Sequence, residues 1–130
     1  MEFLASNKKP TRWMSPEGLQ NKNWSVESDV WSYGILLWEI VTLGARPYPK
    51  MTMDMVKQQV TKGYKMPRPS HCGQELYSIM TNCWEIEPEK RYSYDVIQQK
   101  LEPMMEVYHE YLSVRNMDER LYESVADITV

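Results

Sequence analysis

The chain contains 130 residues, of which 42% are hydrophobic and 25% are charged, and it carries a formal net charge of −3. This length and apolar content predict one modest globular domain rather than a disordered chain. The slightly acidic balance excludes the strongly basic surface expected of a nucleic-acid-binding protein. The start of the chain, M-E-F-L-A, is too short and acidic for a signal peptide, so we expect an intracellular protein without a membrane segment.

The first residues lead into an extended segment and a short helix. Residues 1–9 show little pattern and are expected to form a disordered start. Pro10 then fixes an extended entry into P-T-R-W-M-S-P-E, residues 10–17. Pro16 and Glu17 suit the first turn of a helix, because proline tolerates the first helical position and a carboxylate stabilises the amino-terminal end.

The centre of the sequence, S-D-V-W-S-Y-G-I-L-L-W-E-I-V-T, predicts the helix around which the rest is organised, residues 28–42. Ser28 or Asp29 would cap this helix, and Gly44 would end it. Its apolar side chains fall on every side of a helical wheel, which is typical of a buried helix. They are Val30, Trp31, Ile35, Leu36, Leu37, Trp38, Ile40 and Val41.

Two helices are predicted after the central one. Thr52 would cap a helix that runs through Lys62 and is closed by Gly63, with Met53, Val56 and Val60 on one face. The spacing of the apolar residues then predicts an amphipathic helix over residues 74–84.

A last helix of the domain is expected to open at Ser93 or Tyr94, and Pro103 to end or kink it. Residues 103–130 would form a tail with one further helix over 104–115 and a flexible end. No segment alternates convincingly like a strand, so the sequence predicts an all-α fold with long loops.

Four motifs stand in a fixed order along the chain: residues 10–17, residues 28–42, R-P-Y-P at 46–49, and C-W-E-I-E-P-E-K-R at 83–91. Together they resemble the C-terminal lobe of a protein tyrosine kinase, of either the receptor or the cytoplasmic type. The match covers residues 10–102 and only the last part of a kinase domain. The resemblance implies an incomplete helical lobe of the protein-kinase fold, namely its substrate-side half.

The resemblance also implies roles for individual residues in binding the substrate. The segment that shelves a peptide beside its tyrosine would be formed by Pro10, Arg12, Trp13 and Met14. The alternative for Trp13 is a plain packing role.

Three charged residues also match the family. Glu17 and Arg91 would form an ion pair that ties this segment to the last helices, since a guanidinium fork suits a partly buried carboxylate. Asp29 would anchor the catalytic loop of a complete domain, or would act only as a helix cap in this chain.

The kinase motifs that bind ATP are missing from the sequence. The five glycines never approach G-x-G-x-x-G spacing, the one phenylalanine, Phe3, is not in a D-F-G, and neither histidine begins an H-R-D. We therefore expect no catalytic, cofactor-binding or metal-ligating residues, and the chain as given should be inactive. ATP and Mg²⁺ are implied only for the complete family domain. Cys72 and Cys83 lack C-x-x-C spacing and are expected as buried or loop thiols rather than as a metal site with His71.

The sequence leaves two functions open. The first is a fragment of a protein tyrosine kinase whose complete domain phosphorylates protein tyrosines. The second is a short non-catalytic form that binds other proteins, because Tyr111 and Tyr122 share a Y-x-S-V pattern that adaptor domains would read once phosphorylated. Both imply protein partners, either tyrosine-containing substrates or adaptors. Both also place the chain in the cytoplasm or on the cytoplasmic side of a membrane receptor.

Overall fold

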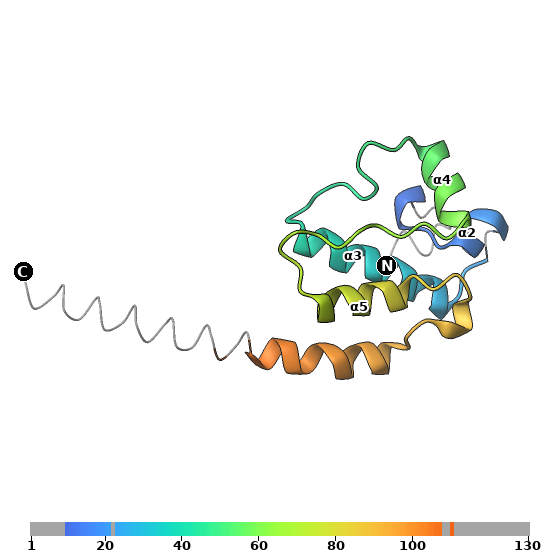
Figure 1. Ribbon diagram of the computed structural model, residues 1–130. Coiled ribbons are helices and arrows are strands. Elements are labelled where there is room, and N and C mark those ends of the chain that lie inside the picture. The colour runs from blue at the N-terminus through green and yellow to red at the C-terminus, as the bar shows by residue number, and fades with distance from the viewer. Residues whose placement is uncertain (1–9, 22, 108–109, 111–130) are drawn as a thin grey trace, which may run out of the picture. The chain divides into compact units, whose positions relative to one another are not determined.

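The computed structural model describes residues 10–21, 23–107 and 110, and in these residues every regular element is a helix and none is a strand (Figure 1). The prediction of an all-α fold is therefore confirmed. The chain divides into two units, residues 1–95 and residues 96–130. The elements of the first unit are η1 (Thr11–Trp13), α2 (Pro16–Asn21), α3 (Val26–Val41), α4 (Met53–Thr61), α5 (Gln74–Cys83) and η2 (Pro88–Lys90).

The central helix, α3, begins at Val26, earlier than the predicted position. Its N-cap is Ser25, whose Oγ accepts a hydrogen bond from the Ser28 amide at 3.1 Å, while the Ser25 amide donates to Ser28 Oγ at 2.9 Å. This reciprocal pair is a capping box, which satisfies two backbone amides at once. The predicted cap at Ser28 or Asp29 is therefore wrong, because both residues lie inside the first turn.

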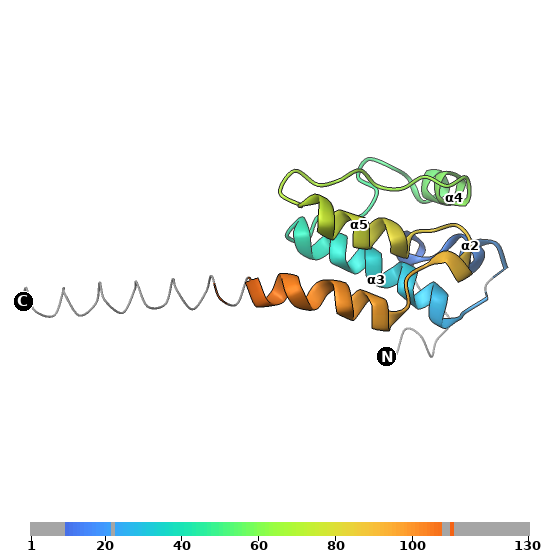
Figure 2. The same cartoon turned by 60° about the horizontal axis from the view of Figure 1, so that its bottom comes forward.

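The core of the first unit forms where α3 and α5 run side by side, as both views show (Figure 1, Figure 2). A β-carbon at Gly34 would lie 2.6 Å from Trp84 Nε1 and 2.7 Å from Cys83 Cβ, so the absence of a side chain there allows the close approach. The fully buried large side chains include Trp31, Ile35, Ile79, Met80 and Trp84. Burying such side chains supplies the main stabilisation of a domain of this size.

One side of α3 is exposed. The side chain of Leu36 is 47% exposed and that of Ile40 is 61% exposed, whereas Trp31, Ile35 and Leu37 are buried. The prediction of a helix buried on all sides is therefore wrong for these two positions. Packing against α5 covers one face of the helix, and an apolar residue on another face can remain in contact with water.

The two following helices lie where the sequence predicts them. Thr52 caps α4, since its Oγ1 accepts a hydrogen bond from the Met55 amide at 3.2 Å. Gly63 follows the helix with φ of 99°, a conformation that suits glycine. Val56 and Val60 are buried as expected of one face, but Met53, the first residue of the helix, is 52% exposed.

Residues 94–107 are helical without interruption at Pro103. Of the two outcomes expected at Pro103, an end of the helix or a kink, the end is wrong, because residues 104–107 continue the helix beyond the proline. The described residues of the second unit, 96–107 and 110, are helical. No helix within residues 10–21, 23–107 and 110 has the length and apolar content that a bilayer crossing requires.

Candidate functional site

The candidate site is the segment of residues 10–14, which lies against α3. Pro10 is extended, with φ of −60° and ψ of 140°, and its carbonyl accepts a hydrogen bond from the Trp13 amide at 3.0 Å. Two polar side chains of α3 hold Trp13. Ser32 Oγ donates to the Trp13 carbonyl at 2.6 Å, and Trp13 Nε1 donates to Glu39 Oε1 at 2.5 Å. Both the backbone and the indole of Trp13 are therefore fixed.

Arg12 points into the protein. It is 8% exposed, and its guanidinium donates to the carbonyls of Pro47 at 2.9 Å, Tyr48 at 3.1 Å and Met51 at 2.6 Å. The loop that receives it contains two non-glycine residues with positive φ, Tyr48 at 53° and Lys50 at 68°. Such conformations are uncommon and need support from their surroundings. Arg12 thus ties the candidate site to the loop that follows α3.

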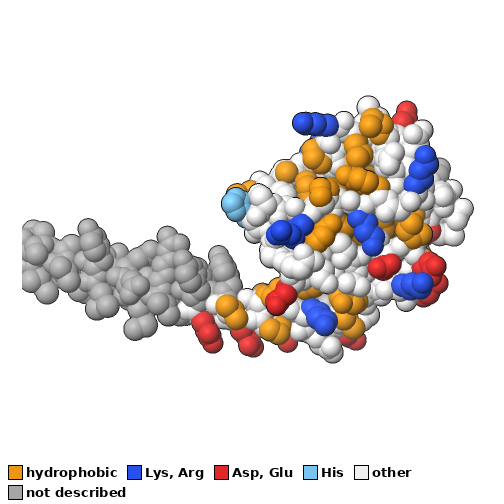
Figure 3. All heavy atoms as spheres, in the orientation of Figure 1, with side chains coloured by type: hydrophobic (Ala, Val, Ile, Leu, Met, Phe, Trp, Pro, Cys, Tyr) orange, Lys and Arg blue, Asp and Glu red, His pale blue; other side chains and the backbone are white. Residues whose placement is uncertain are grey.

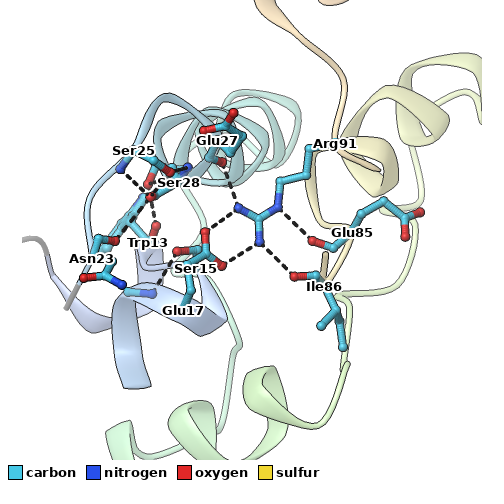
Figure 4. Close-up of polar contacts among 12 residues, drawn as sticks. Trp13, Ser15, Glu17, Asn23, Ser25, Glu27, Ser28, Glu85, Ile86 and Arg91 are labelled. Carbon is cyan, nitrogen blue, oxygen red and sulfur yellow. Dashed lines mark hydrogen bonds and ion pairs between the residues drawn. The ribbon is translucent and has the colours of Figure 1, made fainter. Parts of the chain in front are cut away.

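The structure brings Glu17 and Arg91 together in a bidentate ion pair (Figure 4). Arg91 Nη1 and Nη2 donate to the two carboxylate oxygens of Glu17, each at 2.7 Å. The Arg91 side chain is 0% exposed and that of Glu17 is 19% exposed. Burial alone would raise the pKa of Glu17, but the hydrogen bonds and charge of Arg91 outweigh it and hold this pKa below its ordinary value.

The remaining donors of Arg91 also have partners. Nε donates to the Glu85 carbonyl at 2.8 Å, Nη1 to the Glu27 carbonyl at 2.9 Å, and Nη2 to the Ile86 carbonyl at 3.3 Å. Figure 4 shows the guanidinium between these carbonyls and Glu17. The charge also lies 5.1 Å from the centre of the Trp31 ring, within the range of a cation–π contact. One side chain therefore joins α2, α3 and the loop after α5.

The sequence of the chain has relatives among known proteins. Residues 3–101 match the family described as protein tyrosine and serine/threonine kinase. The chain belongs to this protein kinase family. The chain is 38% identical over 128 residues, 98% of its length, to the tyrosine kinase receptor Cad96Ca of Drosophila melanogaster. It is 41% identical over 109 residues, 84% of its length, to the human tyrosine-protein kinase FRK.

A third relative is the human tyrosine-protein kinase Fer, which is 46% identical over 92 residues, 71% of this chain. The matches cover 17% of Cad96Ca, 22% of FRK and 11% of Fer, so the chain spans about a fifth of these tyrosine kinases or less. The resemblance to the C-terminal part of a tyrosine kinase is thereby confirmed. The similarity extends over the candidate site and over both partners of the ion pair.

Asp29, the third charged residue singled out in the sequence of this kinase chain, lies in the first turn of α3. It is close to Tyr94, whose pKa is raised by burial and by the charge of Asp29. The Tyr94 ring stands edge-on to Tyr33, with 5.8 Å between the ring centres. The possible phosphotyrosines Tyr111 and Tyr122 lie outside the described residues.

The other sequence-predicted features lie away from the candidate site. Cys72 and Cys83 are free, buried thiols. Burial raises the pKa of Cys83 to about 12, against a smaller opposing effect of Arg91. Within the described residues, no three His, Cys, Asp or Glu side chains gather in a way that could hold a metal ion.

Sequence reasoning missed the residues of α3 that hold Trp13. Ser32 and Glu39 stand seven residues apart and so share one face of the helix. Two polar residues on one face of a largely apolar helix are a signal that they have polar partners. Ser15 was also missed as a contributor. It is fully buried, and its Oγ accepts a hydrogen bond from the Gly18 amide at 3.2 Å at the start of α2.

Proposed function

We propose that this chain supplies the substrate-binding half of a protein tyrosine kinase, in which residues 10–14 position a tyrosine-containing protein segment. The observation that carries the proposal is the fixed position of Trp13 on α3, in a chain whose relatives are tyrosine kinases. A rigid binding surface of this kind accelerates a reaction by holding the substrate in a productive orientation. Pro10 and Met14 flank Trp13 and offer the adjoining surface.

The role of Arg12 in this proposal differs from a direct substrate contact. Its guanidinium donates hydrogen bonds to three carbonyls of the 47–51 loop, so Arg12 would act by holding residues 10–14 in position. Glu17 and Arg91 would hold the other end of the same segment. Directional hydrogen bonds at both ends limit movement of the residues between them.

ATP and Mg²⁺ do not fit the described residues. The chain lacks the glycine loop, the H-R-D and the D-F-G that bind nucleotide and metal in kinases, and the described carboxylates do not gather into a metal site. Phosphoryl transfer would require the remaining parts of a complete domain, and the chain alone would neither bind ATP nor transfer phosphate. The protein would act in the cytoplasm or on the cytoplasmic side of a membrane receptor, where tyrosine-containing protein segments and ATP meet.

A chimera tests this function. The corresponding residues of the human FRK kinase domain are replaced by this chain, and peptide phosphorylation is measured with a tyrosine peptide and its serine counterpart. We expect phosphorylation of the tyrosine peptide only. In the same chimera, Trp13→Ala should raise the KM for the peptide and leave the KM for ATP unchanged.

Two outcomes would contradict the proposal. One is a folded chimera that binds ATP but does not phosphorylate the tyrosine peptide. The other is a Trp13→Ala chimera with an unchanged KM for the peptide. Saturable ATP binding by the isolated chain would contradict the statement that ATP is bound only by the remaining parts of a complete domain, and would favour a nucleotide site within this chain. Peptide binding by the isolated chain with an inactive chimera would instead favour the non-catalytic binding function.

A further inference from the structure

Glu39 is an acidic residue at the unfavourable end of α3. It stands in the last turn of the helix, which ends at Val41 and contains no basic residue in that turn. The carboxyl end of a helix carries a partial negative charge, so a carboxylate in the last turn lowers the stability of the helix. Residues that oppose the stability of their own element are expected mainly where function requires them.

The charge of Glu39 is not compensated by a cation among residues 10–21, 23–107 and 110, where the ion pairs involve other carboxylates. Its side chain is half-buried, and Oε1 accepts the hydrogen bond from the Trp13 indole at 2.5 Å. A hydrogen bond to an ionised acceptor is shorter and stronger than one to a neutral acceptor. The contact with Trp13 is therefore the interaction that stabilises this carboxylate.

Three other tryptophans show what the Glu39 contact adds. The indole nitrogens of Trp31, Trp38 and Trp84 are buried without a hydrogen-bond partner in the part of the chain that the structure describes. Packing restrains these rings, since each residue is 6% exposed or less. Trp13 is only half-buried, so packing restrains its ring less. The carboxylate of Glu39 gives the Trp13 indole a direction that packing alone does not.

We infer that Glu39 is a positioning residue, whose carboxylate orients the Trp13 indole for the protein substrate and is retained although it lowers the stability of α3. This inference rests on the proposed function of residues 10–14. It adds that the acceptor at position 39, and not the Trp13 ring alone, sets the affinity for the substrate. Ser32 acts differently, because it holds the carbonyl of Trp13 and leaves the direction of the indole to Glu39.

The FRK chimera that carries this chain tests the effect on the substrate. Glu39→Ala should raise the KM for the tyrosine peptide by about tenfold, because it removes a hydrogen bond to a charged acceptor. The KM for ATP should not change, which also shows that the variant is folded. Glu39→Gln keeps an acceptor oxygen and should change the KM for the peptide by less than about threefold. Trp13→Phe keeps an aromatic ring without the indole N–H, so it should match Glu39→Ala, and the double variant should show no additional rise.

NMR spectra of the indole N–H groups of the full chain test the contact itself. Trp13→Phe identifies the Trp13 signal among the five tryptophans of the chain. Glu39→Ala should shift this signal upfield and speed its exchange with water, because the indole N–H loses its acceptor. Glu39→Gln should shift the signal less. A Trp13 signal that Glu39→Ala leaves unchanged would overturn the inference without any measurement of phosphorylation.

Stability and a matched control complete the test. Glu39→Gln removes a charge from the negative end of α3, so its melting temperature should equal or exceed that of the unchanged chain. Charged side chains of both signs are scattered over the face of the described residues that Figure 3 shows, so the control must remove a carboxylate elsewhere. Glu75→Ala removes an exposed one from the first turn of α5, and it should change the KM for the peptide by less than about twofold.

The outcomes distinguish a failure of this inference from a failure of the proposed function. A folded chimera with the unchanged chain that binds ATP but does not phosphorylate the peptide would overturn both. An active chimera in which Glu39→Ala leaves the KM for the peptide unchanged would overturn the inference alone. Equal rises in that KM for Glu39→Ala and Glu75→Ala would show a general effect of charge and would also overturn it. A Glu39→Gln chain that melts well below the unchanged chain would contradict the conflict between this carboxylate and the stability of α3.

Discussion

Replacing Glu17 by alanine is expected to destabilise the chain by about 3 kcal/mol, because it leaves the buried Arg91 cation without its counter-charge. Arg91 would keep its hydrogen bonds to three carbonyls, so the loss should lie near the lower end of the range for broken buried pairs. Arg91→Ala removes those bonds and the contact with Trp31 as well, and should cost about 5 kcal/mol. The double variant should cost little more than Arg91→Ala alone.

Urea unfolding followed by tryptophan fluorescence measures these differences, and the double-mutant cycle isolates the pair. Lys90→Ala is the matched control, since Lys90 makes an exposed ion pair with Glu87 at 3.0 Å and its loss should barely move the midpoint. If the effects of Glu17→Ala and Arg91→Ala simply add in the double variant, the two side chains do not stabilise the protein together and the reasoning fails.

Lowering the pH should weaken the contribution of the Glu17–Arg91 ion pair to the stability of the chain. The pKa of Glu17 is lowered in the folded state, so its contribution is present above the unfolded value of about 4.3 and disappears as the pH falls through the lower folded value. The stability difference between the parent chain and Glu17→Gln should therefore shrink as the pH falls below about 4.3. A constant difference across that range would show that the carboxylate charge contributes nothing.

Two further predictions concern the core. Gly34→Ala should destabilise the chain by about 1 to 3 kcal/mol, because the new methyl group meets side chains of α5 and of the residue after it. Gly73→Ala has open space and loses only the preference for glycine at the N-cap of α5, so it serves as the control with a smaller loss. Thermal unfolding followed by circular dichroism compares them, and equal losses would disprove the close helix approach. Cys83 should resist a thiol reagent until denaturant is added, because burial raises its pKa to about 12. Rapid labelling of Cys83 in the native chain would contradict this.

The sequence was sufficient to predict α3, α4 and α5, because apolar spacing and capping residues are local signals. It placed the start of α3 too late, at Ser28 or Asp29. Two serines three residues apart both resemble caps, and the choice of Ser25 depends on a reciprocal pair of hydrogen bonds. The exposure of Leu36 likewise depends on which face α5 covers, and the spacing of residues within α3 carries no information about its neighbours.

The candidate site was less predictable than the fold. Arg12 stands beside Trp13 in the sequence, and a resemblance places both residues at the substrate. The structure directs the arginine away from that surface, toward carbonyls of the 47–51 loop. Backbone carbonyls carry no sequence signature, since every residue has one. A side chain whose partners are all backbone atoms therefore cannot be assigned from residue types alone.

The two buried arginines explain how so short a segment becomes rigid. Residues 10–17 form only a three-residue η1 and the start of α2, and neither presents a long apolar stripe that could fix its position by packing. Arg12 binds one end to a loop 35 or more residues away in the sequence, and Arg91 binds the other end from 74 residues away. These bonds are directional, and the planar guanidinium makes several of them at once. Lysine could therefore not replace either arginine and form the same set of hydrogen bonds. Precise positioning of Trp13 thus comes from polar contacts, while the apolar core between α3 and α5 stabilises the helix that carries its partners Ser32 and Glu39.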